Sequence, residues 1–414
     1  MPRPLFPADT GGKIRTLNIV QRLAGRMEIH AVSPAHPQRD AEAADQMRRV
    51  FRSYTPVAWK ETAKFTPAFY AGFLRSRFGA LPYFLAKYAL PEFRRAVEQV
   101  AERERVDLVL CDFLHSAVAM KESKVRPRVV FQHNVEYVIR KRHWETEKNP
   151  VRKWLLAAEW EKAQRVEAAV CREFDHVITV SEEDERQIRE EFGVAHVSAL
   201  PTGVDTKYFQ PQAAPQRAGN LVFVGSMDWQ PNEDGIFWFV REVYPQVRRR
   251  APHASLTVVG RNPSARVRQL AEQDHSIEIT GTVPDVRPYL ARAEAVVVPL
   301  RIGGGTRIKI FEAMAMERAV VSTTLGAEGL PVENEKEILM ADAAPALAAA
   351  VDRILSEATL RESIARAGGA KVVRDHTWER VACRMEEILS RVVGSQAGTA
   401  IEETLAAPRA MLAN

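Results

Sequence analysis

Short β-branched runs alternate with helix-like segments through the second half of the chain, and this pattern constrains the fold most strongly. Helix-like segments such as NEDGIFWFVREVYPQVRRR and PSARVRQLAEQ separate the runs. The runs are LVFVG (221–225), SLTVVG (255–260), IEIT (277–280), AVVVPL (295–300), AVVST (319–323) and EILMA (337–341). Such alternation predicts an α/β fold with a parallel sheet and crossover helices, in which ligands approach the carboxyl ends of the strands.

The first half alternates in the same way but less regularly. KIRTLNIVQRLAG predicts a helix that ends at Gly25, and a long helix is expected over RKWLLAAEWEKAQRVEAAVCREF. The expected strands are MEIHAVSP, VDLVLCDF (106–113), RVVFQHN (128–134) and HVITVS (176–181).

One strand is missing from this first half. A doubly wound domain should begin with a strand, but only MPRPLF precedes the first loop and helix. This segment is too short and too rich in proline for a buried central strand. Either the true start lies upstream or the domain lacks an element near its middle, and we favour the upstream start.

Length and composition fit two α/β domains. At 414 residues the chain is too long for one ordinary core, and its 46% hydrophobic and 27% charged residues are typical of a globular enzyme. We expect an amino-terminal domain over 1–205, a linker over 206–219, a carboxyl-terminal domain over 220–376, a closing helix over 377–394 and a weakly ordered tail over 395–414.

Cysteine usage and hydropathy predict the compartment. Cys111, Cys171 and Cys383 are far apart without paired spacing, so neither a disulfide framework nor a metal site is expected. There is no apolar signal segment, and no apolar run is long enough to cross a bilayer. We expect a cytoplasmic protein, with the inner face of the membrane as the alternative location.

Positive charge is concentrated in the first quarter of the chain. Residues 1–100 contain sixteen Lys or Arg and eight Asp or Glu, so their surplus of eight exceeds the net charge of +5 of the whole chain. An anionic partner such as a phosphorylated substrate or an acidic lipid surface would suit this region, and a solvated surface is the alternative. No known nucleic-acid module is visible, so we expect no nucleic-acid partner.

The stretch PLRIGGGTRIKIFEAMAMERAVVST (299–323) carries the strongest functional pattern. Its glycines follow a strand and lead into a helix, where backbone amides and the helix dipole bind anions. Arg301, Arg307 and Lys309 add the mobile positive charge that a diphosphate would need. An acid would be repelled by phosphate, so Glu312 is expected to bind a neutral polyol such as a ribose. The alternative is a surface turn before a solvated, salt-bridged helix.

Two weaker patterns lie in the first half. TGGK (10–13) places Gly11 and Gly12 before a helix, which suits a phosphate or simply a tight turn. QHNVEY (132–137) places His133 at the carboxyl edge of an expected strand, where functional side chains gather, although a lone histidine is more often structural. Asp112 and His115 have the same placement and a weaker case.

The ordered motifs resemble those of family 4 glycosyltransferases of the GT-B fold, the "glycosyl transferases group 1". They are PADTGGKIRTLNI, FQHNVE, HVITVSEED, LPTGVDTKYFQP, FVGSMDWQPNEDG, LTVVGRNP, ITGTVPDV, the glycine-rich stretch through STTLGAEG, and HTWERVACRMEEIL. The resemblance implies two facing Rossmann-like domains and a closing helix that crosses back to the first. It also implies transfer of a sugar from a nucleotide-sugar donor to an acceptor hydroxyl, with retention and without a cofactor or metal.

The resemblance also assigns residues by their place in the motifs. Glu312 matches the glutamate that holds the donor ribose, and His133 matches the histidine near the donor sugar, our catalytic candidate. Gly11 and Gly12 match glycines that close over the phosphate. The remaining donor-side positions are Gly225, Gly260, Gly281, Arg301, Gly304, Gly305, Thr306, Arg307, Ile308 and Lys309.

Two departures from the family pattern stand out. Gly304 occupies the place where typical members have a glutamate that touches the transferred sugar. The basic pair often found after the first strand of the second domain is absent from SMDWQPN, and Arg301, Arg307 and Lys309 are expected to replace its charge. The GGGTR form of the motif is one that we associate with a subgroup of the family.

The acceptor side is less defined. Aromatic residues between Tyr54 and Phe93 alternate with arginines and lysines, which fits an acceptor face or peripheral membrane contact as well as an ordinary core-facing helix pair. We predict a retaining hexosyltransferase for polysaccharide or glycolipid assembly, acting on a carbohydrate or lipid-linked acceptor. The alternatives are a sugar-nucleotide epimerase of the same fold and a non-catalytic nucleotide-sugar-binding subunit.

Overall fold

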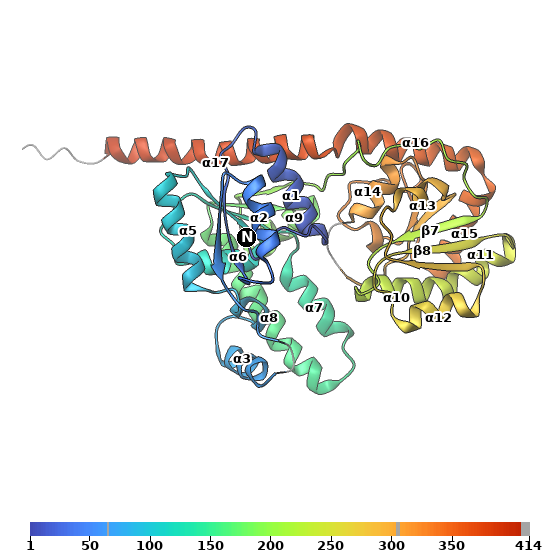
Figure 1. Cartoon of the computed structure of the whole chain (residues 1–414), viewed down its shortest axis with the longest axis horizontal. Helices are drawn as coiled ribbons and strands as arrows, with labels where there is room; N and C mark the ends of the chain where they lie inside the picture. The colour runs from blue at the N-terminus through green and yellow to red at the C-terminus, as the bar shows by residue number, and fades with distance from the viewer. Residues whose placement is uncertain (64–65, 304–306, 407–414) are drawn as a thin grey trace, which may run out of the picture. The chain divides into compact units, whose positions relative to one another are not determined.

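The computed structural model contains two compact units, each built around parallel β-structure (Figure 1). It describes residues 1–63, 66–303 and 307–406, with side chains through residue 395. One unit comprises Met1–Leu200 with Val381–Asn414, and the other comprises Pro201–Arg380.

The second unit contains one parallel sheet with the strand order β12-β11-β10-β7-β8-β9. Its strands are β7 (Asn220–Val224), β8 (Ser255–Val259), β9 (Ile277–Gly281), β10 (Ala295–Val298), β11 (Val320–Ser322) and β12 (Leu339–Met340). Its helices are α10 (Gln230–Trp238), α11 (Tyr244–Arg250), α12 (Ala265–Gln273), α13 (Arg287–Arg292), α14 (Ile308–Ala315), α15 (Ala344–Ser356) and α16 (Ala358–Asp375). A π-helical turn, Phe239–Val243, joins α10 to α11, and a 3-10 turn spans Leu325–Ala327.

Alternating side chains of this sheet enter two apolar cores. Phe223 and Val297 pack into the core that includes residues of α10, α11 and α15. Val222 and Val296 pack into the core formed with α13 and α14. Because successive side chains of a strand point to opposite faces, the continuous apolar runs of the sequence bury both faces of the sheet.

The first unit has its parallel strands in two separate sheets, of order β1-β2 and β3-β4-β5-β6. The strands are β1 (His30–Ala35), β2 (Ser53–Ala58), β3 (Val109–Asp112), β4 (Arg128–Phe131), β5 (His176–Thr179) and β6 (Val197–Ala199). The helices are α1 (Gly11–Leu23), α2 (Ala41–Val50), α3 (Pro67–Phe78), α4 (Tyr83–Ala86), α5 (Pro91–Glu104), α6 (Phe113–Met120), α7 (Glu136–Thr146), α8 (Pro150–Glu173), α9 (Glu182–Phe192) and α17 (Trp378–Ala406).

The sequence pattern missed two strands of this unit. β2 contains a proline and is only partly buried, and β6 has three residues, so neither shows a sustained β-branched run. Strand pairing with β1 and β5 forms them instead. No strand pairs with β3 on the side away from β4 among the described residues.

The carboxyl-terminal helix is longer than expected. We predicted a closing helix over 377–394 and a weakly ordered tail from residue 395, but α17 continues to Ala406. The residues that extend it include alanine and glutamate, which favour helix.

Candidate functional site

The sheet of the second unit reverses its strand order between β7 and β10. From β7 the chain moves to β8 on one side, and β10 then pairs on the other side. The loops that leave these two neighbouring strands diverge at the carboxyl edge of the sheet, which is where ligands bind in wound α/β folds. The first loop leads to α10 and the second to α14, so side chains at the starts of these helices flank the same crevice.

Lys309 of α14 and Asn232 of α10 meet at this position. The Lys309 Nζ donates to Oδ1 of Asn232 at 2.9 Å, and Nδ2 of Asn232 donates to the Ser226 carbonyl at 2.7 Å. A Cβ at Gly225 would lie 2.6 Å from the Lys309 Nζ and 2.8 Å from the Asn232 Nδ2. The glycine after β7 therefore leaves the space that these two side chains occupy.

Burial brings the pKa values of Lys309 and Glu312 close together. It lowers the pKa of the Lys309 ammonium to about 7, with a further lowering by the charge of Arg307. It raises the pKa of the Glu312 carboxyl to about 7, although the charge of Lys309 opposes the shift. Opposite shifts of neighbouring titratable groups are typical of ligand sites.

The two arginines of this stretch form interactions within the unit. Arg301 makes a two-point ion pair with Asp234, with nitrogen–oxygen distances of 3.1 and 2.8 Å. Arg307 is 2% exposed, and its Nη2 donates to the carbonyls of Leu325 at 3.0 Å and Gly303 at 3.4 Å. We expected mobile cations at both positions, but both side chains are engaged within the unit.

The glycine-rich loop lies partly outside the described residues. Gly304, Gly305 and Thr306 fall there, so their expected contacts stay predictions. Gly303 has φ +101°, and a Cβ on it would lie 2.7 Å from Cγ of Pro231. Buried Ile308 begins α14.

Gly260 and Gly281 end their strands in different ways. A Cβ on Gly260 would lie 1.8 Å from the Gly225 carbonyl oxygen, so the loops after β7 and β8 touch through backbone. Gly281 has φ +69°, which favours glycine. Their predicted nucleotide contacts stay predictions.

In the first unit, three polar side chains converge at the carboxyl ends of β3 and β4. His133 Nε2 lies 2.7 Å from Oδ1 of Asp112, and the Thr16 hydroxyl donates to the same carboxylate at 3.1 Å. All three residues are buried. The geometry makes His133 Nε2 the protonated nitrogen, and Nδ1 has no hydrogen-bond partner among the described residues. Burial lowers the pKa of His133, although the charge of Asp112 opposes the shift. The lowered pKa favours the neutral ring.

Phe113 covers His133. Their rings stack with centroids 3.9 Å apart and an interplanar angle of 12°. Phe113 has φ +66°, a left-handed conformation that is rare for an aromatic residue and that marks functional sites when it occurs. A Cβ on Gly12 would lie 2.3 Å from Cζ of Phe113, so this glycine, beside Gly11 at the start of α1, makes room for the phenyl ring.

The sequence reasoning missed Arg15, Thr16 and Asn232. Arg15 is 1% exposed, and its Nε and Nη1 have no hydrogen-bond partner within the described part of the chain. Burial lowers its pKa to about 9, so the guanidinium stays charged at neutral pH. The signal for Arg15 and Thr16 was their place one turn after TGGK, on the side of α1 that turns inward. For Asn232 the sequence offered no signal except that it is a polar residue early in an expected helix.

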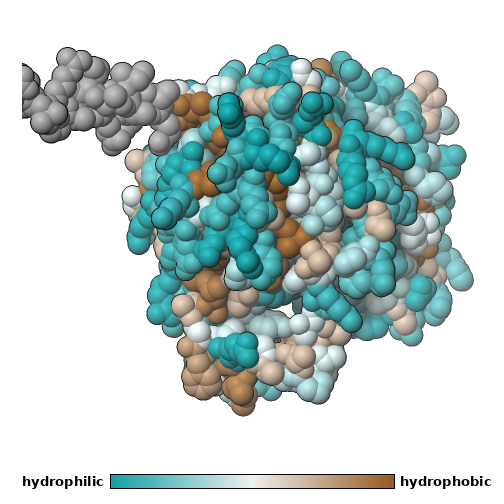
Figure 2. Space-filling model, turned by 60° about the vertical axis from the view of Figure 1, so that its left-hand side comes forward, coloured by the Kyte–Doolittle hydropathy of each residue, from teal (hydrophilic) through white to brown (hydrophobic). Residues whose placement is uncertain are grey.

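The region that contains α3 and the start of α8 exposes apolar side chains. Tyr70, Leu74 and Phe78 recur every fourth residue of α3 and are 56%, 60% and 85% exposed. Trp154, near the start of α8, is 61% exposed and lies under the Arg77 guanidinium at 4.9 Å. Figure 2 shows apolar side chains at the surface of the lower part of the molecule, where Figure 1 places α3. We call this surface, Tyr70, Leu74, Phe78 and Trp154, the aromatic face.

Two features are absent from the residues that the structure describes. No helix there is long and apolar enough to cross a membrane. No three His, Cys, Asp or Glu side chains of that part of the chain converge as metal ligands would.

Family models match both halves of the chain. The model described as "Glycosyltransferase Family 4" matches residues 10–208, and the model described as "Glycosyl transferases group 1" matches residues 218–357. An uncharacterized 44.6 kDa protein in the cps region of Klebsiella pneumoniae is 20% identical over 350 residues, which cover 81% of this chain and 85% of that protein. A glycogen synthase of Mycobacterium tuberculosis is 26% identical over 249 residues, which cover 57% of this chain and 58% of the synthase.

Solved structures share the fold. The sucrose-phosphate synthase of Thermosynechococcus elongatus superposes with a TM-score of 0.68 at 18% identity, over 93% of this chain and 94% of that one. HepE of Anabaena in complex with UDP and glucose superposes with a TM-score of 0.62 at 14% identity, over 92% of this chain and 96% of HepE. The predicted GT-B fold with two Rossmann-like domains is thereby confirmed.

Proposed function

We propose that the chain is a group 1, family 4-like glycosyltransferase that moves a sugar from a nucleotide-diphosphate sugar to an acceptor hydroxyl with retention of anomeric configuration. The observation that carries the donor assignment is the contact between Lys309 and Asn232 at the strand-order reversal of the second unit. This contact holds the titratable ammonium of Lys309 beside the loops that follow β7 and β10. There a diphosphate can replace the amide oxygen of Asn232 as the partner of the ammonium.

Donor recognition would use two neighbouring side chains of α14 differently. Lys309, together with backbone amides of the glycine-rich loop, would bind the diphosphate and stabilise it as it leaves, which is electrostatic catalysis of a departing anion. Glu312 lies three residues further along the helix, and no group among the described residues donates a hydrogen bond to its carboxylate. Its carboxylate would accept the hydroxyls of the ribose, a role that a cation could not fill.

His133 would act on the transferred sugar. Asp112 accepts a hydrogen bond from Nε2–H and fixes the tautomer, so Nδ1 is left to accept a hydrogen bond. Phe113 covers the face of the ring on which it stacks, so a ligand that contacts this face would displace the phenyl ring. Asp112 and Thr16 are positioning residues in this scheme, because they act through His133.

The experiment that tests the donor is a thermal-stability screen with UDP-, GDP- and ADP-sugars, since a ligand that binds the folded state raises its apparent stability. The proposal expects one nucleotide series to raise the melting temperature and Lys309→Met to abolish the rise. The anomeric configuration of the product, measured by proton NMR, tests retention. Donor binding without transfer to any saccharide or glycolipid acceptor would favour a non-catalytic binding subunit.

We propose a polysaccharide or glycolipid acceptor that approaches at the membrane surface. The aromatic face supports this, because exposed aromatic rings beside Arg75 and Arg77 suit the interface of an anionic bilayer. Lys162 fixes the face by donating to the carbonyls of Ser76 and Arg77 at 2.6 and 2.8 Å, which ties the end of α3 to α8.

A further inference from the structure

Aromatic rings surround His115 in the first unit. The ring centroids of Phe84, in α4, and Tyr88, just after it, lie 5.7 and 5.0 Å from that of His115. The Phe113 ring lies 6.3 Å from the His115 ring and also stacks on His133, so it contacts both histidines. We call Phe84, Tyr88, Phe113 and His115 the His115 cluster.

Three cations lie against this cluster. The Arg140 guanidinium, from α7, lies over the Phe84 ring at 4.1 Å from its centroid. The Lys87 ammonium lies 5.2 Å from the centroid of the Tyr88 ring, and Nε of Arg3 donates to the Tyr88 hydroxyl at 3.1 Å. Each cation therefore contacts a ring of the His115 cluster.

The cations act on the imidazole at the centre of the cluster. Burial lowers the pKa of His115 to about 3, together with the charges of Arg140, Lys87 and Arg3. These charges are all positive, so the ring lies in a region of positive potential. It is neutral at neutral pH, and a neutral imidazole can donate one hydrogen bond and accept another. His115 can therefore bind a hydroxyl group without adding charge.

Two of the three cations share one close carboxylate. The Glu61 oxygens lie 2.9 Å from Nη2 of Arg3 and 2.6 Å from Nζ of Lys87. Arg140 has a weaker partner, because the Glu136 carboxylate lies 3.8 Å from its Nη2, beyond hydrogen-bonding distance. Its Nε has no hydrogen-bond partner within the described part of the chain. Arg140 is thus the cation of the three whose hydrogen-bonding capacity is least used.

Burial outweighs the charge of Arg140 at the acids near it. It raises the pKa of Glu136, although the charge of Arg140 opposes the shift. It also raises the pKa of Glu159, on which the charge of Lys162 acts more strongly than that of Arg140. Three cations and two carboxylates, Glu61 and Glu136, leave a surplus of one positive charge around the cluster. One monoanion would balance this surplus.

The position of Arg140 suits a planar anion. Its guanidinium lies over the Phe84 ring, which leaves the N–H groups at its edge for two parallel hydrogen bonds to a carboxylate. Its side chain is 31% exposed, and Phe84, Phe113 and His115 each keep part of their surface exposed. Sites for small ligands combine such apolar and aromatic surface with a few polar groups that fix orientation.

We propose that the His115 cluster binds a hexuronic acid residue of the acceptor saccharide, with the carboxylate on Arg140. The pyranose ring would pack against Phe84 and Phe113, and His115 would form hydrogen bonds with its hydroxyls. A single carboxylate matches the single surplus charge, whereas a diphosphate would bring more negative charge than the surplus balances. This inference rests on the proposed sugar transfer, because it names the acceptor of that reaction.

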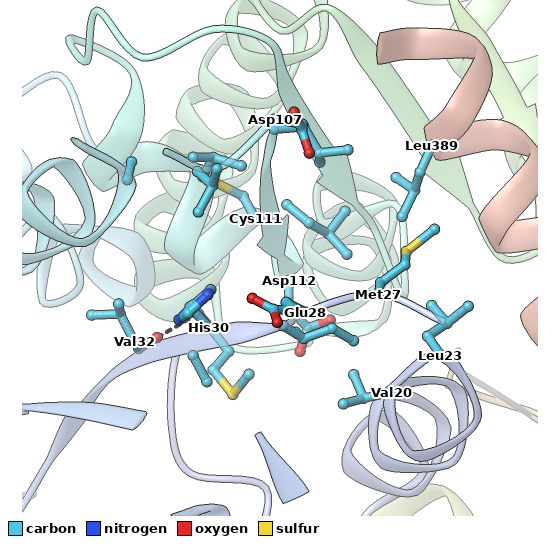
Figure 3. A pocket seen from close by; sticks show the side chains of 18 of the residues that line it. Val20, Leu23, Met27, Glu28, His30, Val32, Asp107, Cys111, Asp112 and Leu389 are labelled. Carbon is cyan, nitrogen blue, oxygen red and sulfur yellow. Dashed lines mark hydrogen bonds between the residues drawn. The ribbon is translucent and has the colours of Figure 1, made fainter. Parts of the chain in front are cut away.

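The His115 cluster is separate from the internal cavity of the same unit. This cavity measures about 800 Å³, and residues of β1, β3, α1, α5 and α17 line it (Figure 3). Its wall includes Asp112, which holds His133, but none of the described residues that line it belongs to the His115 cluster. The proposed saccharide contacts therefore lie outside the cavity.

The test compares sugars that differ in the group on their sixth carbon. Methyl glucuronide and methyl galacturonide carry a carboxylate there, methyl glucoside and methyl galactoside carry a hydroxymethyl group, and glucose 6-phosphate carries a phosphate. Each sugar is titrated into the full chain without a donor, and the NMR signals of the histidine Cε1–H groups are followed. His115→Gln identifies the His115 signal, and the signal of exposed His275 is the reference.

The proposal expects at least one methyl uronide to bind about tenfold or more tightly than its neutral counterpart, and to shift the His115 signal more than the His275 signal. Arg140→Met should remove this preference, because it removes the charge and the N–H groups but keeps a long side chain. Arg95→Met, at an arginine whose side chain is 65% exposed, should keep it. If Arg140→Met fails to fold, Arg140→Lys should reduce the preference, because it lacks the planar guanidinium.

Equal binding of the uronides and their neutral counterparts would overturn the proposal, and so would a preference that survives in folded Arg140→Met. Tighter binding of glucose 6-phosphate than of both uronides would show that the anion is a phosphate and that the uronic acid assignment is wrong. These results do not depend on a donor, so they separate this inference from the sugar transfer. Uronide binding through Arg140 in a chain that binds no nucleotide sugar would leave the saccharide site standing and refute the transfer.

Discussion

The ammonium nitrogen of Lys309 lies 2.9 Å from Oδ1 of Asn232, which joins α14 to α10 across the point where the strand order of the second unit reverses. A neutral amide is a weak partner for a partly buried ammonium compared with a phosphate. The contact therefore holds Lys309 in place without satisfying its charge, and an anionic ligand would do so.

Lys309→Met should weaken binding of the nucleotide sugar selected by the stability screen about 10- to 100-fold, because a hydrogen bond to a charged group is worth about 1.5–3 kcal/mol. Burial lowers the pKa of Lys309 to about 7, so the wild-type affinity should fall as the pH rises through 7. The affinity of the variant should not show this fall and should instead rise over the same range, because the Glu312 carboxyl, whose pKa burial raises to about 7, ionises there and binds the ribose more strongly as a carboxylate. Calorimetry across this pH range measures both effects, and Lys336→Met, at an exposed lysine, is the control.

Gly225→Ala should disturb the donor site more than the fold. Its Cβ would lie 2.6 Å from the Lys309 Nζ and 2.8 Å from the Asn232 Nδ2, so these two side-chain ends must move. We expect nucleotide-sugar affinity to fall several-fold while the melting temperature changes by a few degrees at most. Gly25→Ala, where no atom lies within 4 Å, is the control. Unchanged affinity would show that the Lys309–Asn232 contact does not form part of the site.

Glu312→Gln should change how stability depends on pH. Burial raises the pKa of the Glu312 carboxyl from 4.5 to about 7, so between these values the folded chain binds this proton and the unfolded chain releases it. The contribution of this group to the free energy of unfolding therefore decreases as the pH rises from 4.5 to about 7, by up to about 1.4 kcal/mol per pH unit.

The glutamine variant lacks this proton, so it should gain stability relative to wild type across that interval and keep the gain at higher pH. Urea unfolding at a series of pH values measures the difference. Parallel pH profiles would contradict the raised pKa. The same variant should lose nucleotide-sugar affinity, because an amide accepts ribose hydroxyls less strongly than a carboxylate.

His133→Ala should lower kcat by at least about tenfold and change donor affinity little, because the side chain is assigned to the sugar and not to the nucleotide. Steady-state kinetics together with donor calorimetry separate these effects, and His275→Ala, at an exposed histidine, is the control. Asp112→Asn should shift the pH profile of kcat as well as its size, because it removes the negative charge that raises the His133 pKa and lets an amide N–H face the ring and favour the other tautomer. Wild-type turnover in His133→Ala would remove this residue from the mechanism.

The double substitution Phe78→Ser and Trp154→Ser should reduce co-sedimentation with vesicles that contain anionic lipid. Both side chains are largely exposed, so the melting temperature should change little. Arg75→Gln should weaken binding to anionic vesicles in a salt-dependent way. If wild-type protein fails to sediment with vesicles of any charge, the aromatic face does not bind membranes.

Much of the second unit could be predicted because its signals are local. Each expected strand from LVFVG to EILMA lies in the structure as β7 to β12, since buried parallel strands need continuous apolar runs. β2 and β6 of the first unit escaped prediction because pairing with a neighbour, and not their own composition, makes them strands. Likewise, Arg15 and Asn232 carry no pattern of their own.

The sequence by itself determined the α/β class, the two-domain organisation and the resemblance to group 1 glycosyltransferases, because apolar periodicity and ordered motifs are properties of the chain. Only the tertiary structure decided which polar groups meet. Asp112 and Thr16 are 96 residues apart in sequence. No local preference of the chain can bring a hydroxyl and a carboxylate together over such a separation. Tertiary structure also turned Arg301 and Arg307 from expected free cations into paired groups and revealed the cavity between β1 and β3, because burial and pairing depend on neighbours that only packing supplies.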